Sequence, residues 1–88
     1  MSPDQDLAEQ VIDVRVIVPS HRHPIILRLF DNLDAGRSFQ LLADHDPRPL
    51  RYQFEARYGG GCRWTYLERG PDVWRIRLIR AAGQSEPA

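Results

Sequence analysis

The chain has 88 residues, of which 42 % are hydrophobic and 27 % charged, and it contains no run of eighteen apolar residues. This composition argues against wholesale disorder and a membrane-spanning helix, and the length predicts one small globular domain. The 12 basic and 12 acidic residues give zero formal net charge, which disfavours a nucleic-acid partner because whole-molecule attraction to phosphate is missing.

The two ends differ in composition from the middle of the chain. Residues 1–10 are polar and acidic and lack the basic and apolar regions of a secretory signal, so we expect a cytoplasmic protein. We also expect residues 1–10 and 81–88 to be flexible tails around a single domain at residues 11–80.

The first half of the domain predicts a strand, a helix and a second strand. Residues 11–18 are β-branched and largely apolar, which is typical of a buried strand that Pro19 ends. From Pro24 the apolar residues recur every three or four positions, which predicts a helix of about ten residues. Residues 38–44 alternate between apolar and polar side chains and predict the second strand.

The second half predicts a short helix and a hairpin. In residues 50–58 the apolar side chains stand four apart, and a proline precedes them, as at the start of a helix. The triglycine at 59–61 ends this helix. Residues 62–68 and 73–80 are aromatic and β-branched runs joined by a turn, which indicates a closing hairpin.

The order β-α-β-α-β-β predicts an α+β fold. We expect a two-layer sandwich in which two helices cover one face of a four-stranded mixed sheet. Because a helix connects the first two strands, they should be parallel neighbours whose carboxyl ends lie together. The segments that leave these two strands are therefore expected to meet.

All three histidines lie in those two segments. His21, His23 and His45, with Asp44 or Asp46, would offer nitrogen and oxygen ligands to one divalent metal ion. Ser20, Arg22 and Arg48 complete the candidate binding surface. The alternative is that His23 and the two aspartates only cap helices and form turns, since such residues often precede a helix.

The only cysteine offers little for catalysis. Cys62 follows three glycines at the start of a strand and lacks the helix N-terminus that stabilises a thiolate. A single cysteine also excludes an internal disulfide and a multi-cysteine metal site. No serine, histidine and acid are spaced so as to indicate a triad, so we do not expect an enzyme.

The hairpin offers an alternative surface. Arginines alternate with aromatic and aliphatic residues along both of its strands, so one face is expected to be apolar and the other basic. Such a face could bind RNA through Arg63, Arg75 and Arg77. An ordinary solvated sheet face, or one that pairs with a second copy or another protein, is the competing interpretation.

Several short motifs carry a resemblance that covers nearly the whole domain. They are residues 11–15, His23-Pro24, Asp44-His45-Asp46-Pro47, Pro49-Leu50, Gly70-Pro71 and Trp74. With them the chain resembles a family of uncharacterised bacterial domains of unknown function, found alone, in tandem or fused to hemerythrin-like domains. That family in turn looks like a relative of the TusA/SirA sulfur carriers, and the resemblance implies their two-layer sandwich.

The sulfur carriers hold a reactive cysteine in a Cys-Pro-X-Pro motif that opens the first helix. The equivalent stretch here is residues 21–24, where Pro24 matches the second proline and His21 stands in place of the cysteine. Persulfide relay needs a thiolate at that position, so the resemblance implies the fold and the location of the site but not the carrier's chemistry.

From these observations we predict a non-catalytic accessory or interaction module. Its partner would be another protein or a second copy, with no membrane partner, and its histidines would hold a metal or redox cofactor. A sulfur-relay component and an RNA-binding module are the alternatives.

Overall fold

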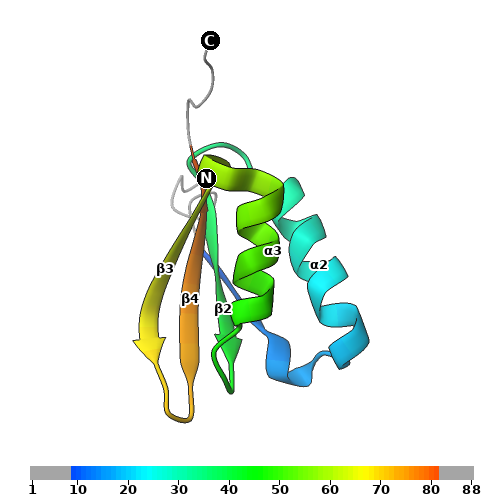
Figure 1. The fold of residues 1–88 in the computed structure, drawn as a ribbon, viewed down its shortest axis with the longest axis vertical. Coiled ribbons are helices and arrows are strands. Elements are labelled where there is room, and N and C mark those ends of the chain that lie inside the picture. Colours follow the sequence, from blue (N-terminus) through cyan, green and yellow to red (C-terminus); the bar gives the residue numbers. More distant parts are fainter. Residues whose placement is uncertain (1–8, 82–88) are drawn as a thin grey trace, which may run out of the picture.

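The computed structural model describes residues 9–81, which form one sheet and two longer helices (Figure 1). The elements are β1 (Gln10–Asp13), a 3-10 turn (Val14–Val16), α2 (Pro19–Asp31), β2 (Ser38–Ala43), α3 (Arg48–Tyr58), a second 3-10 turn (Gly59–Gly61), β3 (Cys62–Arg69) and β4 (Trp74–Arg80). The predicted α+β class and element order are confirmed. Of the predicted flexible tails, residues 1–8 and 82–88 lie outside the described residues.

The sheet has four strands in the order β1-β2-β4-β3. β1 and β2 are parallel, as the helical connection between them predicts, and Ile12 lies opposite Leu41. β4 pairs antiparallel with both β2 and β3, and a bulge interrupts its pairing with β3 between Tyr66 and Glu68. The carboxyl ends of β1 and β2 therefore lie at the same end of the sheet, the lower end in Figure 1.

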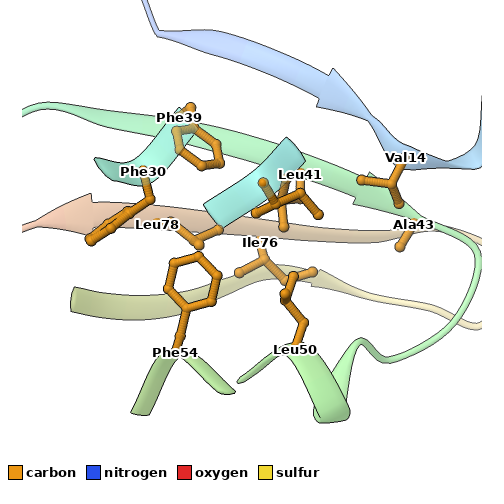
Figure 2. Packing of buried hydrophobic residues seen from close by; sticks show 10 residues of the cluster. Val14, Phe30, Phe39, Leu41, Ala43, Leu50, Phe54, Ile76 and Leu78 are labelled. Atoms are coloured by element: carbon orange, nitrogen blue, oxygen red, sulfur yellow. The ribbon is translucent and has the colours of Figure 1, made fainter. Parts of the chain in front are cut away.

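The core lies between the sheet and the two helices (Figure 2). Side chains on β2 alternate between buried and half-buried, which is the pattern of a strand with one face against the core. Phe30 of α2 and Phe54 of α3 meet edge to face, with their ring centroids 5.2 Å apart. The buried residues are Val14, Ile26, Phe30, Phe39, Leu41, Ala43, Leu50, Phe54, Ile76 and Leu78.

The first strand is shorter than predicted. It ends at Asp13, whose carboxylate accepts a hydrogen bond from the backbone N–H of Arg15 at 3.0 Å and so starts a 3-10 turn. A short acidic side chain that bonds the following backbone competes with the ladder of a sheet. Within the predicted strand, Val14 is buried, but Val16 and Val18 are 81 % and 58 % exposed.

The first helix begins five residues earlier than predicted. Pro19 occupies its first turn, where the missing N–H of proline costs nothing. Pro24, the predicted start, lies inside the helix and leaves the Ser20 carbonyl without its usual donor. His21 and His23 therefore belong to a helix, so the faces they occupy are fixed by helical geometry.

The second helix and the hairpin lie close to their predicted bounds. α3 begins at Arg48, two residues before the predicted start, and the three glycines form a turn that leads directly into β3. Neither α2 nor α3, nor any other helix within residues 9–81, is long and apolar enough to cross a membrane.

Candidate binding pocket

A pocket of about 90 Å³ opens where β1 and β2 end. The second turn of α2 contributes Arg22 and His23, and the connection from β2 to α3 contributes His45. The predicted meeting of these two segments is confirmed. The remaining lining residues are aliphatic or proline, namely Val14, Ile26, Leu41, Ala43, Pro47, Pro49 and Leu50.

His21 does not join this pocket. It lines a separate, open hollow on α2 with Pro24, Ile25 and Arg28. Successive residues of a helix are about 100° apart around its axis. His21 and His23 are two residues apart in α2 and therefore point to nearly opposite sides of it. Within residues 9–81 no three histidine, cysteine, aspartate or glutamate side chains are grouped so that they could hold a metal ion. The structure thus brings together two of the three histidines.

The Asp44 carboxylate holds the ring of His45. Nδ1 of His45 lies 2.6 Å from Oδ1 of Asp44, and both side chains are largely exposed. This hydrogen bond is the main reason that the pKa of the Asp44 carboxyl is lowered, and the charge of Arg22 adds to the effect. Because Nδ1 faces the carboxylate, Nε2 of His45 is left for a ligand.

Asp46 fastens the connection between β2 and α3 to the sheet. It accepts a hydrogen bond from the Tyr66 hydroxyl at 2.7 Å and one from Nε of Arg48 at 3.3 Å. Neither aspartate caps α3, because the residue that precedes the helix is Pro47 and no side chain of the described residues accepts a hydrogen bond from the backbone N–H groups of its first turn. The alternative in which the aspartates cap this helix is therefore wrong, and Asp46 instead bonds Tyr66 and Arg48 beside the pocket.

Arg22 is fixed in orientation but keeps most of its donors. Its Nε donates to the Ile17 carbonyl at 2.9 Å, and no carboxylate within residues 9–81 lies close enough to form a salt bridge with it. Ser20 lies in the first turn of α2, is exposed and does not line the pocket. Of the predicted binding surface, Arg22 is the residue that reaches the cavity.

The basic sheet face is largely neutralised by acidic side chains. Arg77 donates two hydrogen bonds to Glu9, at 2.7 and 2.9 Å, and Arg75 donates to Gln40 and lies 3.6 Å from Glu68. Arg63 is exposed on the outer strand β3. Since two of the three predicted RNA-binding arginines already face carboxylates, Arg63 is the one of the three left to attract phosphates, which disfavours RNA binding by this face.

Glu9 and Gln10 were missed as parts of the folded domain because their neighbours in sequence are polar. Glu9 also accepts hydrogen bonds from Ser38 and Gln40, and Gln10 is the first residue of β1. The partners of Glu9 are 29 to 68 residues away in the sequence, so no local pattern could have indicated them.

β3 begins at the end of the sheet opposite the carboxyl end of β2 (Figure 1), and Cys62 is its first residue. Cys62 is therefore remote from the pocket. Burial raises the pKa of its thiol to about 12. The thiolate is the nucleophile in persulfide chemistry, and it is therefore scarce at neutral pH. This location and protonation state argue against the sulfur-relay alternative.

We expect Cys62 of the folded chain to react with iodoacetamide at pH 8 at least about a hundredfold more slowly than glutathione, because only a very small fraction of the Cys62 thiol is ionised. Mass spectrometry of the alkylated chain over time measures the rate. The same chain in denaturant is the control and should react as fast as glutathione. Equal rates for the folded and the unfolded chain would show that the thiol is neither buried nor shifted.

Comparison with known proteins places most of the chain in one family. Residues 11–80 match the family described as "Uncharacterized conserved protein (DUF2249)". No curated protein and no solved structure matches the chain significantly. The match spans the sheet and both helices, and so includes every residue that lines the pocket.

Proposed function

The chain belongs to the protein family DUF2249, and we propose that it is a non-catalytic accessory module that works by holding a small ligand in the pocket at the carboxyl ends of β1 and β2. The fold supports this location, since ligands of sheets with parallel strands commonly bind beyond the carboxyl ends of those strands. In this role the module would present its ligand to another protein.

One observation carries the proposal. His23 and His45, which stand 22 positions apart in the sequence, line the same small cavity, whose walls are otherwise aliphatic apart from Arg22. A mainly apolar pocket with a few polar groups that converge on it is the usual form of a small-molecule site. The described residues place no nucleophile beside a base in this pocket, which favours binding over catalysis.

The sequence predicts that a divalent metal ion binds in this pocket, and metal binding remains a prediction. His23 and Nε2 of His45 would supply two nitrogen ligands, and Asp44 would orient the second ring from behind, as outer-shell carboxylates do. A structural zinc site has four protein ligands and a catalytic one three. A metal would therefore need water or a partner protein to complete its coordination.

The experiment is an NMR titration of the labelled full chain with zinc and with a panel of molecules of three to six carbons, including acids, amides, alcohols and amines. We expect at least one of them to shift the ring signals of His23 and His45 while those of His21 stay in place. Spectra of the bound molecule after a day at room temperature should show no chemical conversion, as a non-catalytic role requires.

The matched control uses two histidines of the same helix. His23→Ala should abolish the shift, whereas His21→Ala should leave it unchanged because His21 lies in the separate hollow. Circular dichroism checks that both variants keep the fold. If no molecule or metal moves the signals of His23 and His45, the proposed function is wrong.

A further inference from the structure

We infer that the ligand of this pocket is a short aliphatic carboxylate, with its charged group at Arg22 and its hydrocarbon part against the aliphatic wall. The inference rests on the proposed function and names the chemical class of the ligand. It follows from the lining residues, from the bonding of Arg22 and from the size of the cavity.

The polar side chains that line the pocket all belong to basic amino acids. They are Arg22, His23 and His45, and no carboxylate or hydroxyl side chain within residues 9–81 lines the cavity with them. Arginine stays protonated at every physiological pH and carries a full positive charge, and a neutral His23 ring offers one N–H donor, whereas the N–H of a neutral His45 ring is donated to Asp44. This set favours an anion over a cation.

Arg22 is held in the way that recognition of a carboxylate requires. The bond from its Nε to the Ile17 carbonyl fixes the plane of the guanidinium. Its two terminal amino groups donate to no described residue, although the neighbouring Asp44 carries a negative charge. Asp44 is instead bonded to His45. A fixed guanidinium with free terminal N–H groups is suited to bind a carboxylate through parallel hydrogen bonds.

The opposite wall is dry and aliphatic. Ile26, Leu41, Ala43 and Leu50 are each at most 2 % exposed, so a hydrocarbon group placed against them leaves water. Removal of apolar surface from water gives roughly 25 cal/mol for each Å². The ligand therefore needs an apolar part as well as a charge, which distinguishes it from inorganic phosphate or sulfate.

The volume limits the size of the ligand. The pocket holds about 90 Å³, whereas an engineered cavity that binds benzene measures about 150 Å³. A chain of about three to five carbons fits this space, while a nucleotide or a flavin does not. The amino-terminal end of α3 also lies at the pocket, through Pro49 and Leu50, and its positive dipole adds modestly to the attraction for an anion.

The test compares isovalerate with isovaleramide, which has almost the same shape and no charge. Binding to the full chain is followed by the shifts of His23 and His45 in NMR. We expect isovalerate to bind at least about tenfold more tightly than the amide, because a charge-assisted hydrogen bond to a guanidinium contributes more than a neutral one. Arg22→Gln should remove this difference by weakening the binding of the acid alone.

Two further variants keep the test decisive. Ala43→Val should reduce the binding of both molecules, because it places two more methyl groups in the cavity, and Arg28→Gln removes an arginine of α2 that lies outside the pocket and should change neither. Equal binding of acid and amide, or undiminished binding of the acid by Arg22→Gln, would overturn the inference and leave the proposed function standing. The proposed function fails separately, if the whole panel and zinc leave His23 and His45 unmoved.

Discussion

Phe30→Ala is expected to lower the free energy of unfolding by about 3–5 kcal/mol, the usual cost of truncating a fully buried phenylalanine. The Phe30 ring is 0 % exposed and packs against the rings of Phe54 and Tyr58, with centroid distances of 5.2 and 4.5 Å. The guanidinium carbon of Arg80 lies 5.3 Å from the ring centroid. Truncation would remove contacts from α2 to α3 and to β4.

Urea unfolding, followed by circular dichroism and tryptophan fluorescence, measures this loss. A small domain has a total stability of about 5–15 kcal/mol, so the variant should be partly unfolded at room temperature if the chain lies near the lower limit. Tyr52→Ala is the control, because Tyr52 is an aromatic residue on α3 that is 62 % exposed, and it should change stability by at most about 0.5 kcal/mol. Similar losses in both variants would contradict the core as described.

Glu9→Gln is expected to destabilise the chain at pH 7 by about 2 kcal/mol, a typical value for hydrogen bonds to a charged group. The hydrogen bonds from Arg77 are the main reason that the pKa of the Glu9 carboxyl falls from its ordinary 4.5 to about 2. A carboxyl whose pKa is lower in the folded than in the unfolded chain stabilises the fold above its unfolded pKa. This contribution is lost as the pH falls from about 4.5 to about 2.

The difference between wild type and Glu9→Gln should therefore be large at pH 7 and small near pH 2. Urea midpoints at several pH values test this dependence, with Glu55→Gln as the control. Glu55 pairs with Arg51 on the exposed surface of α3, where one ion pair contributes less than about 1 kcal/mol. A difference between wild type and Glu9→Gln that does not change with pH would show that Glu9 acts through packing alone and not through its charge.

The sequence predicted the elements that have a regular pattern and a clear end. In β2 the alternation of side chains matches a strand with one buried face, and in α3 the apolar residues stand one helical turn apart. The two errors both concern a local signal that has more than one meaning. Asp13 was predicted to lie within a longer strand, but its side chain accepts a hydrogen bond from the backbone of Arg15 and β1 ends there. Pro24 was predicted to start the first helix, but the helix begins at Pro19.

The wrong start of α2 explains why only part of the site was predicted. The parallel pairing of β1 and β2 was enough to predict that their following segments meet, which is a matter of topology. The faces that His21 and His23 occupy depend instead on where α2 begins. With the helix starting at Pro19, only His23 reaches the pocket. The role of Arg22 depends on a bond to a carbonyl in the preceding loop, which the sequence does not indicate.

The wall of the pocket is made of the same side chains as the core. Ile26, Leu41, Ala43 and Leu50 belong to the buried cluster and also line the cavity. A bound molecule would add its contacts to that cluster, so occupancy should raise the melting temperature in proportion to the logarithm of ligand concentration once the site is nearly saturated. Selectivity and thermal stability therefore cannot evolve independently in this protein, since any residue exchanged on the wall to suit a different ligand also changes how well the domain folds.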